Sequence, residues 1–75
     1  MLEIPKNEID IHIGKRIQLG RKLYHGMDEK RFAEVMNISL YKLKKYEEGR
    51  SSIPALTLNE IAKKLNVTFS YFFIG

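Results

Sequence analysis

The chain has no cysteine, which excludes disulfide bonds and any metal site built on thiolates. It also lacks an uninterrupted apolar run of the ~18 residues that a membrane-spanning helix needs. Its first residues show no basic segment followed by an apolar one, so we expect no signal peptide. These absences favour a cytoplasmic protein without a membrane partner.

The residue sets that carry enzyme chemistry are missing as well. His12 and His25 stand apart from each other and from any cluster of metal-ligating residue types. We find neither a nucleophile with its base nor a glycine-rich phosphate loop. A chain of 75 residues forms one small domain and leaves little room for a sizeable pocket. The sequence therefore argues against an enzyme, and it indicates no cofactor, no metal and no small-molecule effector.

The formal charge of +4 is modest, so the placement of the charges is more informative than their sum. Lysine and arginine concentrate between Lys15 and Arg50, whereas the last third of the chain is nearly neutral and ends in aromatic residues. A basic middle and an apolar end indicate one surface for a polyanion and a separate surface for packing.

The middle of the chain has the pattern of two short helices joined by a tight turn. Asp28 is a good N-cap for a helix of about 29–36, and Ser39 is a good N-cap for a second helix that ends near Gly49. Asn37 lies between them, where a tight turn needs a residue that tolerates the left-handed conformation. This layout predicts a helix-turn-helix.

The second of these helices has two different faces. Leu43 and Tyr46 are three residues apart and share the side that faces the core. The remaining positions give a cationic, partly aromatic surface formed by Tyr41, Lys42, Lys44 and Lys45. Such a surface is typical of a helix that enters a nucleic-acid groove.

The N-terminal part of the chain predicts an arm and a long helix. Residues 1–9 form the expected arm, in which Pro5 opposes regular structure. The composition favours a disordered leader, and an arm that reaches a partner subunit or DNA stays open as the alternative. We expect Asp10 to cap a helix of about 11–24.

The C-terminal part predicts two further helices. Ile53-Pro54 starts the first, because proline in a first turn leaves no N–H unpaired. Asn66 ends it, and Thr68 caps a last short helix over 69–73.

Residues 69–74 hold five large apolar or aromatic side chains, which a short helix cannot all bury because successive positions are ~100° apart. We expect Phe69 and either Phe72 or Phe73 to face the core, and Tyr71 and Ile74 to be exposed. A purely intramolecular core remains an alternative, but large exposed apolar patches usually mark interfaces. The predicted dimer interface therefore comprises Phe69, Tyr71, Phe72 and Ile74.

The whole set of residues, in its order and spacing, resembles the phage-repressor and Cro type of helix-turn-helix, also called the Xre family. The resemblance runs from about Asp10 to Phe73. It implies an all-α fold, a compact five-helix domain of the lambda-repressor-like type over residues 10–75. The residues that carry it are Ile13–Ile17, Gly26-Met27, Phe32-Ala33, Met36–Ser39, Leu43, Tyr46-Glu47, Gly49 and Ile61–Val67.

The resemblance also implies the residues that contact double-stranded DNA. The base-contacting residues would be Leu40, Tyr41, Lys42 and Lys45. The phosphate-contacting residues would be Lys30, Lys44, Arg50, Ser51 and Ser52. The family further implies a structural ion pair between Arg21 and Glu47, because a half-buried charge needs a partner.

Two positions depart from the family pattern. Glu29 stands where the family usually has glutamine, and its carboxylate would repel a DNA phosphate. The segment between Arg21 and Gly26 is one residue longer than is usual in the family.

We therefore expect a sequence-specific DNA-binding transcriptional regulator that binds a pseudo-palindromic operator as a homodimer. The alternative is a protein-interaction module, such as an antitoxin-like partner, whose DNA binding is weak or lost. Glu29 and the apolar C-terminal residues keep this alternative open.

Overall fold

The computed structural model describes residues 6–74 of the chain. These residues form four α-helices, a π-helical turn and a 3-10 helix, and no strand occurs among them. The predicted all-α fold is confirmed, and the expected number of helices is approximately right. The elements are α1 (Lys6–Leu19), the π turn (Gly20–Tyr24), α2 (Glu29–Met36), α3 (Leu40–Glu47), α4 (Ala55–Leu65) and the 3-10 helix (Phe69–Phe73).

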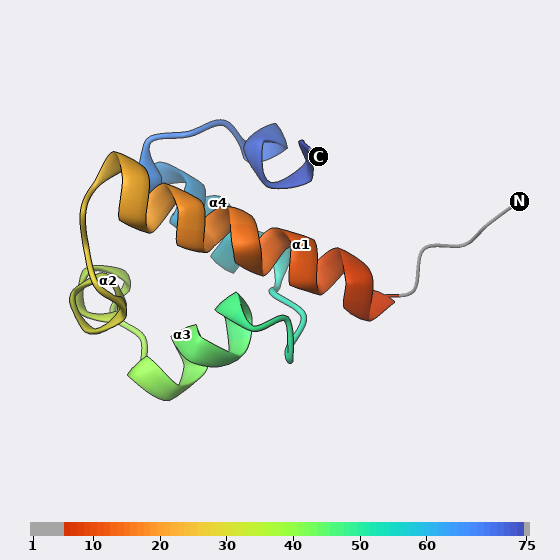
Figure 1. Cartoon of the computed structure of the whole chain (residues 1–75), viewed down its shortest axis with the longest axis horizontal. Coiled ribbons are helices and arrows are strands. Elements are labelled where there is room, and N and C mark those ends of the chain that lie inside the picture. Colours follow the sequence, from red (N-terminus) through yellow and green to blue (C-terminus); the bar gives the residue numbers. More distant parts are fainter. Residues whose placement is uncertain (1–5, 75) are drawn as a thin grey trace, which may run out of the picture.

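α1 runs along the length of the molecule and separates two groups of elements. Figure 1 shows α3 on one side of α1 and the C-terminal 3-10 helix on the other. α1 contacts both, and α2 packs against α3 and α4. Every helix contributes to the single core that this arrangement encloses. Its fully buried members are Ile17, Phe32, Leu43, Ile61, Leu65 and Phe72.

The helix pair α2–α3 has the boundaries that its caps predict. Asp28 Oδ1 accepts a hydrogen bond from the Arg31 backbone N at 2.8 Å, and Ser39 Oγ accepts one from the Lys42 N at 3.0 Å. Asn37 ends α2 in the left-handed region at φ 58°, and Gly49 follows α3 at φ 73°. Both turns and both N-caps are confirmed.

α1 begins earlier than predicted. Residues 6–9 belong to its first turns, so Asp10 lies inside the helix and is not its N-cap. No residue of this stretch opposes a helix, and Glu8 in the first turn complements the positive end of the helix dipole. The predicted arm thus loses residues 6–9 to α1, and its residues 1–5 lie outside the described part of the chain.

The π turn that continues α1 overlaps the segment between Arg21 and Gly26, for which the sequence predicts one extra residue. A helix can absorb one additional residue by widening a turn to i→i+5 hydrogen bonding. The turn then closes through a bond from Met27 N to the Arg21 carbonyl oxygen at 3.1 Å. Gly20 lies at a point of close approach, because a Cβ there would be 3.0 Å from Leu65 Cδ1.

The C-terminal elements occupy the predicted positions but differ in detail. α4 starts at Ala55, so Pro54 precedes the helix as its N-cap residue and does not lie in its first turn. Asn66 ends α4 at φ 60°, as predicted. The last helix is of the tighter 3-10 type, and Thr68 does not cap its backbone, since Oγ1 instead lies 3.0 Å from Ser70 Oγ.

The expectation that Tyr71 is exposed is wrong. Tyr71 retains 7 % of its exposed area, and the adjacent Phe72 is fully buried. The Tyr71 hydroxyl donates to the carbonyl oxygen of Arg16 on α1 at 2.8 Å, which draws the ring onto the helix. The expectation that Phe69 faces the core is also wrong, since Phe69 is 42 % exposed, whereas Ile74 is exposed as expected. The large residues left at the surface of this segment are Phe69, Phe73 and Ile74.

Candidate nucleic-acid interface

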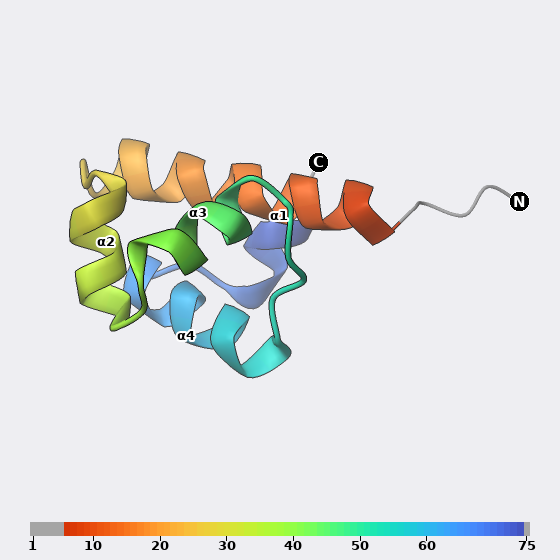
Figure 2. The same ribbon diagram turned by 90° about the horizontal axis from the view of Figure 1, so that it is seen from below.

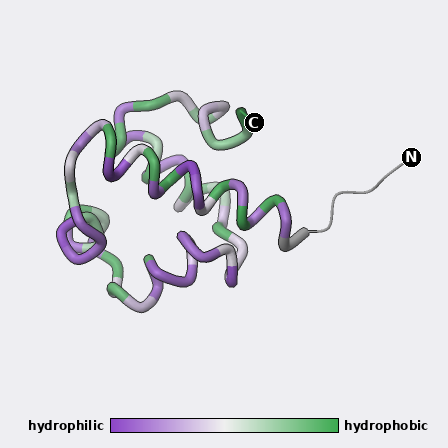
Figure 3. The backbone as a smooth tube through the Cα atoms, viewed as in Figure 1, coloured by the Kyte–Doolittle hydropathy of each residue, from purple (hydrophilic) through white to green (hydrophobic). Residues whose placement is uncertain are grey.

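α3 presents the side chains that the sequence assigns to DNA bases. Leu43 and Tyr46 face the core, whereas Tyr41 is 72 % exposed. Leu40, Lys42 and Lys44 are exposed as well, and Lys45 is half-buried. Figure 3 shows α3 as a mainly hydrophilic helix beside the mixed pattern of α1. The predicted base-contacting residues therefore lie on one short helix with a solvent-exposed, cationic surface.

Two lysines of α3 lie over aromatic rings. Lys45 Nζ is 5.3 Å from the centroid of the Tyr41 ring, and Lys42 Nζ is 6.0 Å from that of Tyr46. An ammonium group at this distance is attracted to the face of the ring. The Tyr41 ring and the Lys45 ammonium thus form one projecting unit on the exposed face of α3.

The predicted phosphate-contacting residues lie on α2, on α3 and in the loop that follows α3. Lys30 is exposed in the first turn of α2, and Lys44 is exposed on α3. In the loop, the Arg50 and Ser52 side chains are exposed and Ser51 is half-buried.

The backbone of this loop adds further donors. The N–H groups of Ser51, Ser52 and Ile53 make no hydrogen bond to another described residue. Free backbone N–H groups beside cationic side chains are the usual partners of DNA phosphates.

A buried ion pair holds α3 onto the end of α1. Arg21 Nε donates to Glu47 Oε2 at 2.8 Å, and Arg21 Nη2 donates to Glu47 Oε1 at 2.9 Å. The third side of the guanidinium is satisfied by the Met27 carbonyl oxygen, 2.9 Å from Nη1. Both charged residues retain only 3 % of their exposed area, so this bidentate pair is shielded from water.

Burial and charge act in opposite directions on this pair. Burial raises the pKa of Glu47, the Arg21 guanidinium lowers it, and the neighbouring Glu29 raises it further, so that the pKa lies above its ordinary value. The hydrogen bond to Glu47 raises the pKa of Arg21. Glu29 is half-buried in the first turn of α2.

Glycine lets the backbone of α3 approach α1 closely. A Cβ at Gly14 would lie 2.5 Å from the Tyr46 carbonyl oxygen, and a Cβ at Gly49 would lie 2.6 Å from Ile11 Cα. The position of α3 is therefore fixed by backbone contact as well as by the ion pair. The sequence signal for this close approach is a glycine in the interior of a predicted helix, and Gly14 is not among the predicted site residues.

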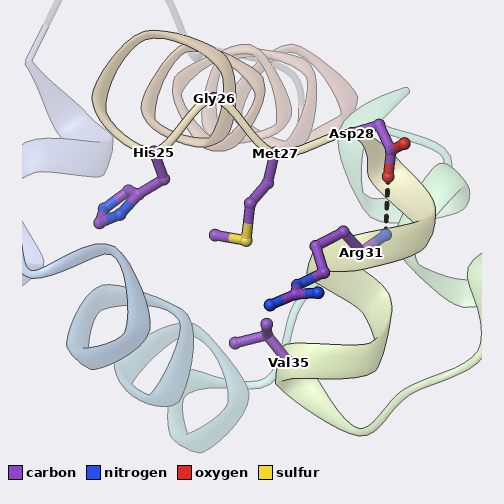
Figure 4. Close-up of a pocket in the computed structure, with 6 residues that line it drawn as sticks. All are labelled: His25, Gly26, Met27, Asp28, Arg31 and Val35. Atoms are coloured by element: carbon purple, nitrogen blue, oxygen red, sulfur yellow. Dashed lines mark hydrogen bonds between the residues drawn. The ribbon is translucent and has the colours of Figure 1, made fainter.

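Elsewhere, the described residues offer no competing chemical site. An open hollow lies between the α1–α2 turn and α2, where Met27, Arg31 and Val35 point into the same space and His25 stands at the rim (Figure 4). His25 Nε2 is 2.8 Å from the carbonyl oxygen of Leu65, so this ring closes the end of α4. Among residues 6–74 no group of acidic and histidine side chains is placed to hold a metal ion.

No helix within the described residues 6–74 combines the length and the apolar character that crossing a membrane requires.

An all-helical domain in which a left-handed asparagine joins two capped helices, the second with an exposed basic face, is a helix-turn-helix domain. Residues 17–72 match the family described as Helix-turn-helix (HTH_3), and the chain belongs to this family. No solved structure gives a significant match to the chain.

Curated relatives carry the same kind of description. A protein of Sinorhizobium medicae (strain WSM419), described as an uncharacterized HTH-type transcriptional regulator, is 40 % identical over 67 residues, which are 89 % of this chain and 48 % of that protein. A protein of Rhodospirillum rubrum, described as an uncharacterized transcriptional regulator in the ATPase CF(0) region, is 36 % identical over 89 % of this chain and 61 % of its own length. The chain thus spans about half the length of the first of these relatives.

Proposed function

We propose that the chain is a DNA-binding transcriptional regulator that recognises a specific duplex sequence through α3. The observation that carries this proposal is the exposed basic face of α3, held against α1 by a buried ion pair and by close backbone contact. A rigidly mounted helix with projecting side chains suits the major groove, which admits one α-helix. The relatives described as HTH-type transcriptional regulators support the same reading. The site of action would be the cytoplasm.

The contacts divide by their chemistry. The base-reading residues are Leu40, Tyr41, Lys42 and Lys45, since lysine donates to guanine O6 and N7 and tyrosine bonds or stacks with a base edge. The residues that position the domain on phosphates are Lys30, Lys44, Arg50, Ser51 and Ser52, together with the free N–H groups of the loop after α3.

The proposal also includes a homodimer that binds a pseudo-palindromic operator. Burial of Tyr71 and Phe72 in their own domain leaves Phe69, Phe73 and Ile74 for a second copy. Binding to two adjacent major grooves would require the two-fold axis to set the two α3 helices about 34–36 Å apart, one turn of DNA.

The first experiment is selection of bound sites from random duplex DNA, followed by binding measurements at two salt concentrations. We expect an enriched sequence and an affinity that falls steeply with salt, because lysine and arginine release counterions from phosphates. Absence of both enrichment and salt-dependent binding would contradict the proposal. It would favour the protein-interaction module, for which the exposed Phe69, Phe73 and Ile74 are the candidate surface.

Single substitutions then test the base-reading residues. Lys45→Ala and Tyr41→Ala should each weaken binding to the selected site by roughly 1–3 kcal/mol, and weaken binding to random DNA less. Lys64→Ala, which removes an exposed lysine of α4, is the matched control for the loss of one charge. Equal losses on every sequence would reassign Lys45 and Tyr41 to phosphate contact.

The dimer is tested by Ile74→Asp, which places a charge on a residue that is 58 % exposed. Sedimentation should show a folded monomer in place of the dimer, with weaker binding to the full operator. Leu56→Asp is the control, because Leu56 is exposed on α4, apart from the C-terminal segment. If the unmodified protein sediments as a monomer and binds a single half-site tightly, the dimer proposal is wrong.

A further inference from the structure

Two carboxylates accept from, or pair with, side-chain hydrogen-bond donors of the loop between α3 and α4. Glu48 Oε1 lies 3.2 Å from Arg50 Nε, and Asp10 Oδ2 accepts a hydrogen bond from Ser52 Oγ at 2.9 Å. Arg50 and Ser52 are the two exposed side chains of this loop that the proposed function assigns to DNA phosphates.

The two carboxylates approach the loop from different elements. Glu48 is the residue that ends α3, whereas Asp10 belongs to the N-terminal half of α1. Figure 2 shows the loop passing beside this half of α1 on its way to α4. The backbone of Gly49 lies close to that of Ile11 and holds the loop there. Asp10, next to Ile11, therefore faces Ser52 of the loop.

A carboxylate and a phosphate compete for the same donors. Both offer anionic oxygens to a guanidinium or a hydroxyl, and only one of them can occupy a given N–H or O–H direction. The displaced carboxylate stays nearby and repels the incoming phosphate. The two negative charges are close enough for this repulsion to act although the site is exposed to water. The Glu48–Arg50 side chains are 52 % and 74 % exposed, so their pair can open without unfolding.

We propose that Asp10 and Glu48 are affinity-limiting residues of the DNA interface, which hold Ser52 and Arg50 in the free protein and must be displaced when a phosphate binds. This inference rests on the proposed function. As a consequence, the contact with the DNA backbone is weakened on every DNA sequence. Binding of the protein to a given DNA site then depends on the base contacts made by α3.

The test uses the amide variants Asp10→Asn and Glu48→Gln and a random-sequence duplex, with binding followed by fluorescence anisotropy at low salt. We expect each variant to bind about two- to fivefold more tightly than the unmodified protein, the range given by one exposed ion pair for Glu48→Gln and by one exposed hydrogen bond for Asp10→Asn. Glu60→Gln is the control, since it neutralises an exposed carboxylate of α4 that lies 3.7 Å from Lys63. Its gain measures the effect of one added net charge, and the other two variants must exceed it.

Double variants show whether the effect passes through the named donors. In an Arg50→Ala background, Glu48→Gln should give no more than the gain of Glu60→Gln, because the donor that it releases is absent. In a Ser52→Ala background, the same should hold for Asp10→Asn. Gains that persist in these backgrounds would mean that the carboxylates act only by long-range repulsion, and the inference would be wrong.

Asp10 also allows a purely structural role to be distinguished. Asparagine still accepts a hydrogen bond from Ser52, so a residue that only holds the loop would tolerate Asp10→Asn, while Asp10→Ala would loosen the loop and weaken DNA binding. We expect instead that both substitutions tighten binding, with melting temperatures close to that of the unmodified protein. If the unmodified protein binds DNA and the amide variants match Glu60→Gln, this inference alone fails. If neither the unmodified protein nor any variant binds DNA, the proposed function fails with it.

Discussion

Two arginines anchor the two sides of the molecule to α1 and its π turn, and they do so by different means. Arg21 forms a buried bidentate pair with Glu47 and fixes α3, whereas Arg16 fixes the C-terminal 3-10 helix. Arg16 donates from Nε to the Tyr71 carbonyl oxygen at 2.9 Å, and its guanidinium lies 4.0 Å from the centroid of the Tyr71 ring. The first anchor removes two charges from water, and the second leaves its single charge partly hydrated.

The spacing of the arginines explains why they serve opposite sides. They are five residues apart, which in a regular helix is a rotation of about 140° and a rise of about 7.5 Å. The difference between the two anchors teaches that the α3 side depends on a matched pair of charges. The C-terminal side depends on an aromatic ring and on backbone carbonyl oxygens. A side-chain substitution can remove the ring but not the carbonyl oxygens.

The largest expected effect comes from breaking the buried pair. Glu47→Gln or Arg21→Met alone should lower the free energy of unfolding by roughly 3–5 kcal/mol, because the remaining charge stays buried without a partner. The double variant should recover part of the loss. Thermal and urea melts measure the change, and Glu60→Gln in the exposed pair with Lys63 should shift them by less than about 0.5 kcal/mol. A single variant that melts like the parent would show that the pair contributes no net stability.

The second anchor should be weaker. Tyr71→Phe removes the hydroxyl that donates to the Arg16 carbonyl oxygen and should cost about 1 kcal/mol. The same substitution has a pH signature, because burial raises the pKa of Tyr71 above its ordinary value of 10.0. The stabilisation is present below that pH and is lost as the pH rises, since the phenol ionises in the unfolded chain first. Urea melts between pH 8 and pH 11 should therefore fall less steeply for Tyr71→Phe than for the unmodified protein, and parallel curves would contradict this assignment.

The sequence predicts the α2–α3 side of the molecule better than the contacts between distant segments, for a physical reason. Asp28, Ser39, Asn37 and Gly49 act on backbone groups within a few residues, so the sequence alone locates α2 and α3. Asp10 resembles an N-cap just as well, but its carboxylate bonds Ser52, 42 positions along the chain.

The same limit applies to the side chains at the surface. Tyr71 is drawn inward by Arg16, 55 positions away, and no local pattern signals such a contact. Helical spacing did identify the exposed face of α3, but it gave no sign that Glu48 and Asp10 occupy donors of the neighbouring loop.

The smallest expected effect concerns the charge beside the buried Arg21–Glu47 pair. Glu29→Gln removes a negative charge that raises the pKa of Glu47, and it should stabilise the fold by about 0.5 kcal/mol at neutral pH. Because the folded pKa of Glu47 lies above its ordinary value, the gain is complete only at pH values above that raised pKa, and it should vanish as the pH falls through it and Glu47 becomes protonated in the folded protein. Melts at pH 7 and pH 3 measure the difference.

Glu29→Gln should also tighten DNA binding if the residue lies beside a phosphate, as the family pattern implies. Stabilisation without tighter binding would show that Glu29 serves only the ion pair. An equal gain at pH 7 and pH 3 would mean that the charge of Glu29 is not the cause.

The π turn makes the length of the chain locally adjustable. One residue inserted between Gly14 and Leu19 would rotate everything after it by about 100° and carry Arg21 away from Glu47. The widened turn at Gly20–Tyr24 lies where α1 ends, after both Gly14 and Arg16 have made their contacts. Only a change of length after Arg21, between Lys22 and Tyr24, would therefore leave the contacts of Gly14, Arg16 and Arg21 with their neighbours in place.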